Sequence, residues 1–146
     1  MSEATERKPP LPLILSFVAC REIWCDQRTN TYIVVAPTRE VSAAHFPTHV
    51  RLSFFVELTG GHGSYQPRMA LRDIEDEVVW GWTGNHPFES DNPLVPHQVT
   101  FLDILVAVPR PGAYRFVFQL NGEDAAQRPM WFRPLQPDRP QGPGGD

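Results

Sequence analysis

Apolar and polar residues alternate with a period of two along most of the chain, and this feature restricts the possible folds most. In the clearest run, Val50–Leu58, every second residue is apolar, and Arg51, Ser53 and Glu57 lie between them. Successive side chains of a strand point to opposite faces, so the run predicts a strand with one apolar face. Phe55 stands out on the predicted polar face and is therefore a candidate contact for a partner.

Two more alternating runs follow in the C-terminal half of the chain. Their predicted inward residues are Leu102, Ile104, Val106 and Val108 in the first run, and Tyr114, Phe116, Phe118 and Leu120 in the second. Pro111-Gly112 between the runs fits the centre of a type II turn. Asn121-Gly122 tolerates positive φ and predicts a two-residue type I′ turn into a partner strand at about 123–132.

The rest of the chain is also mostly rich in β-forming residues. Further strands are predicted at 13–20, 32–36, 65–71 and 78–82. Residues 38–46 allow a helical turn or two, 73–77 is predicted to be an exposed charged turn, and 84–96 to be a long loop. Many short strands without a strand–helix rhythm predict an all-β, antiparallel two-sheet sandwich, immunoglobulin-like or jelly-roll-like, with about seven to eight strands.

With 146 residues, the chain is long enough for one core and too short for two ordinary ones. We expect the sandwich to span 11–132. Residues 1–10 are polar and end in two prolines, and 133–146 are dense in proline and glycine. Both ends are therefore predicted to be flexible tails.

Charge and cysteine content limit the partners and the compartment. The formal net charge is −4, so the basic surface that attracts nucleic acid or anionic membrane is not expected. Cys20 and Cys25 have no second pair that would complete a zinc site. We interpret them as reduced structural thiols, which favours a cytoplasmic protein.

The segment 11–20 has a second interpretation, as a bacterial lipoprotein leader that ends at Cys20. Glu3 and Glu6 precede the segment, Phe17 fits poorly three positions before the cysteine, and no flexible linker follows. We therefore predict a strand of the domain here.

Several short motifs recur in order along the chain. They are Ala19-Cys20, Cys25-Asp26, Thr29-Asn30, Phe46-Pro47, Leu58-Thr59-Gly60-Gly61, Asp91-Asn92-Pro93-Leu94 and Pro109-x-Pro111-Gly112-x-Tyr114. Together they make the chain resemble an uncharacterised family of short bacterial proteins of unknown function. The resemblance covers about residues 13–132. It implies an all-β domain and brings no activity, cofactor or catalytic residue with it.

Trp80 and Trp82 are the most suggestive candidates for a binding site. Two residues apart on a strand, they must point the same way, and paired aromatic rings on a sandwich face can stack on sugar rings. Val78 is predicted on the same face, which favours a core row instead. The candidate contact residues are therefore these two tryptophans with Asn85, His86 and Phe88 from the following loop, in addition to Phe55.

The sequence favours no catalytic, cofactor or metal site. The candidate metal ligands besides the cysteines are His45, His49, His62, His86 and His97, and none of them falls in a typical ligand pair. No carboxylate pair in an apolar setting is evident that would supply acid–base catalysis. We therefore expect a non-catalytic protein-binding or scaffolding module whose partner is another protein or a second copy. Carbohydrate-like ligand binding is the alternative, and a metal-dependent enzyme is the weakest.

Overall fold

A computed structural model describes residues 9–84 and 86–135, and these form strands and no helix. The eleven strands are β1 (Leu13–Asp26), β2 (Thr31–Pro37), β3 (Glu40–Ala43), β4 (Thr48–Thr59), β5 (Gly63–Tyr65), β6 (Pro67–Arg72), β7 (Val78–Thr83), β8 (Phe88–Ser90), β9 (His97–Val108), β10 (Gly112–Leu120) and β11 (Glu123–Pro134). The all-β prediction is confirmed. Among the described residues there is no helix long and apolar enough to cross a membrane.

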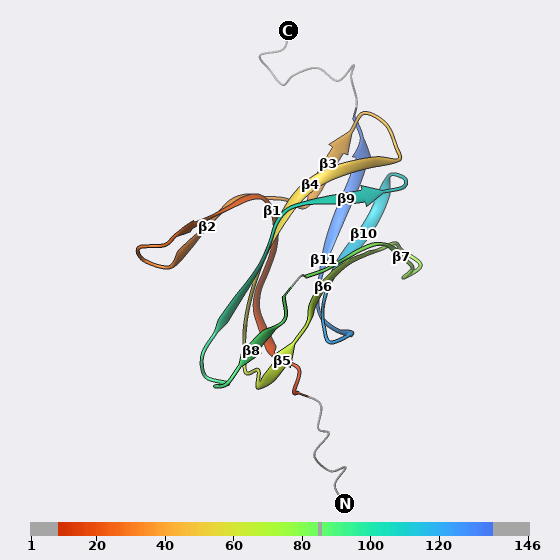
Figure 1. Cartoon of the computed structure of the whole chain (residues 1–146). Helices are drawn as coiled ribbons and strands as arrows, with labels where there is room; N and C mark the ends of the chain where they lie inside the picture. The colour runs from red at the N-terminus through yellow and green to blue at the C-terminus, as the bar shows by residue number, and fades with distance from the viewer. Residues whose placement is uncertain (1–8, 85, 136–146) are drawn as a thin grey trace, which may run out of the picture.

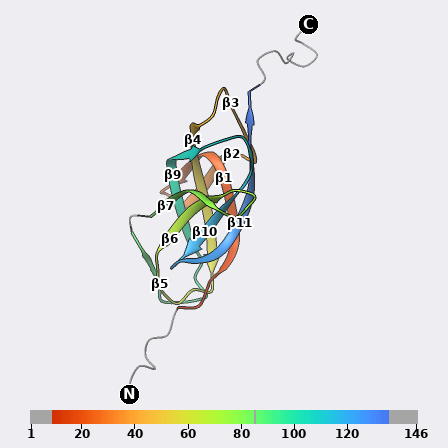
Figure 2. The ribbon, with the colours of Figure 1, turned by 90° about the vertical axis from the view of Figure 1, so that its right-hand side faces the viewer.

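Two main sheets face each other as a sandwich (Figure 1). Sheet A has the strand order β2-β1-β4-β9, sheet B has the order β3-β11-β10-β6-β7, and β5 pairs separately with β8. Along one side of the sandwich β1 approaches β11, and along the other β9 approaches β7 (Figure 2). The predicted two-sheet sandwich is confirmed.

The core lies between the two sheets and is built by the alternating runs. In β4, Leu52, Phe54, Val56 and Leu58 are buried, as are Tyr114, Phe116, Phe118 and Leu120 in β10. The Phe54 and Phe116 rings meet across the sandwich with their centroids 4.8 Å apart. Such aromatic side chains bury the largest apolar areas in a core, so the contact joins the two sheets.

The tight turn after β10 has the predicted form. Leu120 pairs with Glu123, and Asn121 and Gly122 have φ of 53° and 83°. Positive φ at both central residues is what a type I′ turn requires. At Gly112 φ is 149°, far from the roughly +80° of a type II turn, so the predicted turn type before β10 is wrong.

The strand count and one strand direction differ from the prediction. Seven to eight strands were expected, but the 65–71 run splits into β5 and β6, and the short β3 and β8 were not predicted. Residues 38–46 contain β3 where helical turns were allowed. Carbonyl groups at both ends of this segment accept hydrogen bonds, since Trp131 N–H of β11 donates to Arg39 O just before β3 at 3.0 Å, and Leu135 N–H just after β11 donates to Ala43 O at 2.7 Å. The β3–β11 pair is parallel, so the sandwich is not purely antiparallel.

Contacts with the body extend slightly beyond the predicted span of 11–132 at both ends. Strand β11 continues to Pro134, and Arg133 and Pro134 pair with β3. At the other end, the Tyr65 hydroxyl donates to the Pro10 carbonyl at 2.6 Å. Residues 1–8 and 136–146 of the two predicted tails lie outside the described residues.

A β-bulge in β9 changes its predicted inward row. Leu52 pairs with Ile104 but Phe54 pairs with Phe101, so two residues of β9, Leu102 and Asp103, lie opposite Ser53. The extra residue reverses the facing on one side of the bulge. Phe101 is consequently buried and Leu102 is exposed.

Candidate functional site

The two candidate tryptophans lie on β7, which is the last strand of sheet B. Trp80 pairs with Leu71, and Trp82 pairs with Met69. Because both partners belong to the core between the two sheets, both tryptophans are on the face that looks toward the core. Trp80 is half-buried and meets Phe116 edge-on, at 6.4 Å between centroids, whereas Trp82 is 40% exposed. The rings therefore share a face, as predicted, but only Trp82 is open to a ligand.

Val78 does not belong to that row. The register shifts between Leu71 and Arg72, so that Trp80 pairs with Leu71 and Val78 with Arg72. The bulge at Val79 puts Val78 on the opposite face, where it is exposed. The prediction of a Val78–Trp82 core row is wrong for this reason.

A groove of about 410 Å³ lies at the side of the sandwich where the two sheets part. Its lining comes from β9 and from the β6–β7 side, namely Pro67, Trp82, Gly84, His86, Val99, Thr100, Phe101, Leu102 and Ile104. We call it the β7–β9 groove. It brings together two of the predicted contact residues, Trp82 and His86. Asn85 lies outside the described residues.

The other two candidate residues lie away from this groove. Phe88 on β8 stacks on Tyr65 at 5.4 Å between ring centroids and also approaches His97, at 5.6 Å. Phe55 is half-buried on the outer face of sheet A, where Tyr32 covers it at 5.3 Å. The six predicted residues therefore do not form one site.

Asp73 was predicted in an exposed turn, but it is buried. Its Oδ1 accepts the backbone N–H of Glu75 at 2.9 Å and that of Glu77 at 3.0 Å, and its Oδ2 lies 3.3 Å from Arg110. The carboxylate replaces the hydrogen bonds that this tight loop cannot make with its own backbone. The prediction that all charges of 73–77 stay in water is wrong for Asp73.

The two cysteines lie on the same strand in different surroundings. Cys20 is buried on the outer side of sheet A and Cys25 is exposed. The Cys20 thiol donates to the Ser53 carbonyl, with Sγ 3.5 Å from the oxygen, and burial raises the pKa of this thiol. Only Cys20 fits the predicted structural role. No group of three or more His, Cys, Asp and Glu side chains among the described residues could hold a metal ion.

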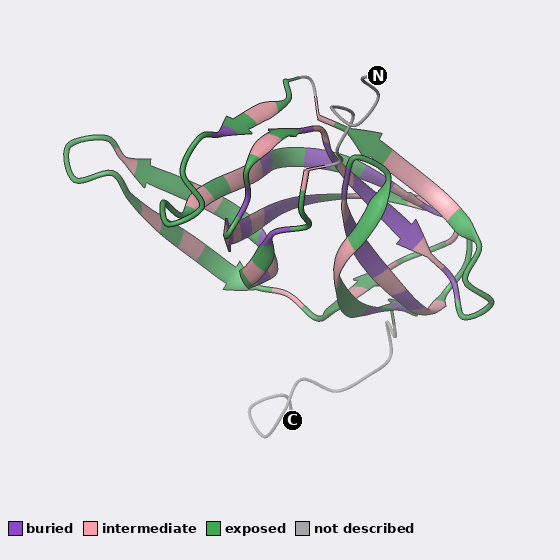
Figure 3. Cartoon of the chain, turned by 90° about the horizontal axis from the view of Figure 1, so that it is seen from below, coloured by how far each residue is buried: buried purple, intermediate pink, exposed green. Residues whose placement is uncertain are grey.

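The sequence analysis missed the most exposed element of the fold, which is the hairpin formed by the end of β1 and by β2. We call residues 21–37 the arm. It projects from the sandwich in Figure 1, and in Figure 3 it carries only the colours of exposed and intermediate residues. Trp24 and Ile33 are 60% and 53% exposed, and Val35 is also exposed. The β-rich pattern predicted a strand in this segment. It did not indicate that both faces of the hairpin would lie outside the sandwich, without a second sheet over them.

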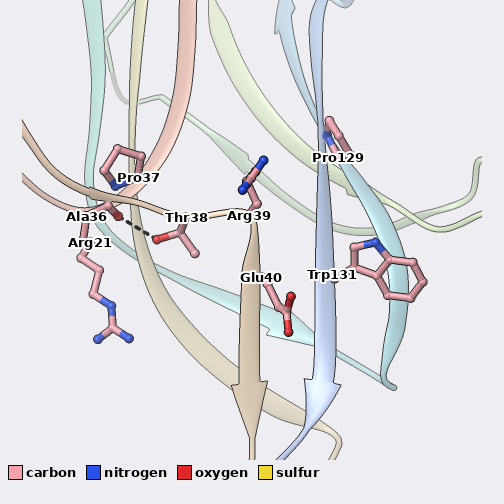
Figure 4. A pocket seen from close by; sticks show the side chains of 8 residues that line it. All are labelled: Arg21, Ala36, Pro37, Thr38, Arg39, Glu40, Pro129 and Trp131. Atoms are coloured by element: carbon pink, nitrogen blue, oxygen red, sulfur yellow. Dashed lines mark hydrogen bonds between the residues drawn. The ribbon is translucent and has the colours of Figure 1, made fainter. Parts of the chain in front are cut away.

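A pocket of about 540 Å³ lies where the arm joins the body. The residues that line it are Arg21, Ala36, Pro37, Thr38, Arg39, Glu40, Pro129 and Trp131 (Figure 4). We call it the base pocket. Glu40 pairs with Arg133 at 2.9 Å, and Figure 4 shows the Arg21 and Arg39 guanidinium groups pointing in different directions. The arginines do not converge on one point, so the pocket lacks the geometry of a small-anion site.

Comparison with known proteins gives no match: no family model matches the chain, and neither does any curated protein.

Proposed function

We propose that this protein is a non-catalytic protein-binding module and that the arm is its docking element. The observation that carries the proposal is the arm itself, a two-stranded ladder that projects into water and exposes Trp24, Ile33 and Val35. Clustered exposed apolar side chains on a projecting element are typical of interaction sites.

The physical argument concerns the stability of such a hairpin. Two strands alone are at best marginally stable in water, and a stable ladder needs a third strand or a covered apolar face. Within the described part of the chain, Tyr32 of the arm packs on Phe55, and Trp24 lines an open pocket together with Leu102, but no second sheet covers the arm. A partner that covers the arm would supply the missing strand or the missing face.

A protein suits this surface better than a small ligand does. Small ligands bind in concave pockets. The concave surfaces that include arm residues are the base pocket and a pocket of about 300 Å³ lined by Arg21–Trp24, Ser53, Leu102 and Asp103, and the exposed Ile33 and Val35 line neither of them. The outer strand of the arm, β2, ends the order of sheet A and leaves one edge unpaired. An unpaired edge offers backbone N–H and C=O groups that an extended segment of another protein can use.

A second candidate function is the binding of a small, carbohydrate-like ligand in the β7–β9 groove. Trp82 and His86 favour it, since they line the same concave surface. The edge-on packing of Trp80 against Phe116 weighs against it because that ring is not free to stack on a sugar. A metal-dependent enzyme remains the weakest proposal.

We also propose that the protein is cytoplasmic and that it binds neither nucleic acid nor membrane. The burial of Phe17, Ala19 and Cys20 in or beside the core supports the interpretation of this segment as a strand of the domain. The net charge of −4 argues against phosphate-rich partners.

Photo-crosslinking in cells tests the docking element. A photoreactive amino acid at Trp24 should give a discrete crosslinked product, identified by mass spectrometry. The matched control carries the same group at Leu94, which is 86% exposed but lies in a loop of the body. Equal products from the two positions, or no product from Trp24, would exclude the arm as the docking element.

A further inference from the structure

The free strand edges of the molecule differ in how well they are protected against pairing. Proteins block such edges with bulges, charges, prolines or short strands. Strand β9 has a bulge that includes Asp103 with φ of 53°, β7 has a bulge at Val79, and β3 has only four residues. Strand β2 carries no charge, its register with β1 has no shift, and only its last two residues, Ala36 with φ of 57° and Pro37, interrupt the edge. Of these four edges in the described part of the chain, the β2 edge from Thr31 to Val35 is the least protected.

We propose that β2 pairs with β2 of a second copy of this chain, in an antiparallel ladder centred on Val34. The inference rests on the proposed docking function of the arm and names its partner. In this register Val34 lies opposite Val34 of the other copy, and Ile33 lies opposite Val35. Strand β2 carries no charge from Thr31 to Pro37, so the two strands face each other over their whole length, with Tyr32 opposite Ala36 and Thr31 opposite Pro37. The two arms then form a four-stranded sheet, which removes the instability of an isolated hairpin.

Charge complementarity at the two ends supports this register. When the pairing is continued outward from Val34, the turn of one arm (27–30) comes opposite the segment Thr38–Glu40 of the other copy. This segment borders the base pocket of that copy. Arg39 forms no ion pair with any residue in the described part of the chain. At the end of β1, the Asp26 carboxylate accepts the backbone N–H of Arg28 at 3.0 Å, and its second oxygen lies 3.9 Å from the Arg28 guanidinium. The antiparallel arrangement brings the Asp26 end of each arm toward the Arg39 end of its partner.

The contact area of such a dimer is small, because it involves one strand and one turn from each copy. Interfaces below about 1,200 Å² belong to the transient class. Association should therefore be measured to high concentration, up to about 1 mM, by sedimentation velocity of the full chain.

A charge placed at the centre of the ladder tests the register. Val34→Lys puts two like charges directly opposite each other, and so does Val34→Glu, so each variant alone should raise the dimer dissociation constant about tenfold or more. Mixing the two variants places opposite charges across the axis and should restore association. The matched control is Leu94→Lys on the body, which should associate like the wild type.

Two results of this experiment would overturn the proposal. One is a wild type that stays monomeric to the highest concentration. The other is a mixture of the two variants that associates no better than either alone. Far-ultraviolet circular dichroism of each variant must match the wild type, since this shows that a loss of association does not arise from unfolding.

The exposed Cys25 gives an independent distance measurement without mutation. A spin label should react with Cys25 and leave the buried Cys20 unmodified. From strand spacing and rise, the two Cys25 Cα atoms of the proposed dimer are about 20 Å apart. Pulsed dipolar spectroscopy should therefore give one distance near that value, and a dimer without it contradicts the β2–β2 pairing. If the chain stays monomeric while Trp24 crosslinks to a different protein, the self-association fails and the proposed docking function stands.

Discussion

The two halves of β1 lie in one continuous strand and have opposite surroundings. In the first half, Leu13–Cys20 pairs with β4 and buries Phe17 and Ala19 against the facing sheet. In the second half, the strand pairs only with β2, and Trp24 and Cys25 are exposed. Apolar residues occur in both halves. Strand formation depends on local residue type, whereas burial depends on whether another layer lies above the strand.

This difference predicts where substitutions act. In the body, a large side chain contributes transfer free energy and fills space that would otherwise become a cavity. In the arm, the same kind of side chain is mostly in contact with water. Its removal should therefore change the affinity for a partner more than it changes the free energy of unfolding. The predictions below test that separation, beginning with the largest expected effect.

Phe54→Ala should lower the free energy of unfolding by about 3–5 kcal/mol, because it removes a fully buried ring that contacts Phe116 and leaves a cavity. Phe55→Ala, one position along on the outer face, should cost less than about 2 kcal/mol. Urea denaturation of both variants measures the difference. Equal losses would show that the outer face of sheet A is as well covered as the core.

Asp73→Ala should cost about 1–3 kcal/mol, because two backbone N–H groups lose their buried acceptor. The matched control is Asp91→Ala, an exposed aspartate in another loop of the body, which should change stability by less than about 0.5 kcal/mol. Thermal denaturation compares the two variants. Equal stability of Asp73→Ala and the control would mean that water replaces the carboxylate and that the loop is open in solution.

The sequence predicted the fold well wherever neighbouring residues alone determine which face of a strand is apolar and where the following turn lies. The alternation in β4 and β10 identified the core rows, and Asn121-Gly122 identified the turn because only residues that tolerate positive φ suit both central positions. The polar–apolar pattern also placed Phe55 correctly on the outer face.

Bulges and layer coverage could not be predicted in this way. One extra residue at Leu102 or at Val79 reverses the facing of the side chains on one side of it, and neither bulge position is a glycine that would mark the bulge. Asp73 appeared to be one charge of an acidic turn because its partners are backbone groups and an arginine 37 residues away. The arm was missed as a surface because coverage by the second sheet is a property of tertiary structure.

Two positive-φ turn positions, one in the body and one in the arm, extend the comparison of the two regions. Gly122 has φ of 83° in a body hairpin, and Asn30 has φ of 56° at the tip of the arm. A β-branched residue is strained at either position by about 1–2 kcal/mol. Gly122→Val should therefore lower the melting temperature by several degrees. Asn30→Val should leave the main unfolding transition of the body unchanged and increase amide hydrogen exchange in the arm alone. A drop in melting temperature for Asn30→Val would show that arm and body unfold together.

The smallest change in stability is expected for Trp24→Ser, although it removes the largest type of side chain. Trp24 is 60% exposed, and its recorded hydrogen bond is to Glu22, two residues away in the same strand. Loss of an exposed side chain without buried contacts should alter the free energy of unfolding by less than about 0.5 kcal/mol. Urea unfolding of dilute protein, followed by circular dichroism at a concentration where the chain is monomeric, measures this. A loss above about 2 kcal/mol would mean that the pocket that Trp24 lines together with Ser53 and Leu102 closes in solution and buries the indole against the outer face of sheet A. The arm would then belong to the folded body, and both the docking proposal and the β2–β2 pairing would lose their basis.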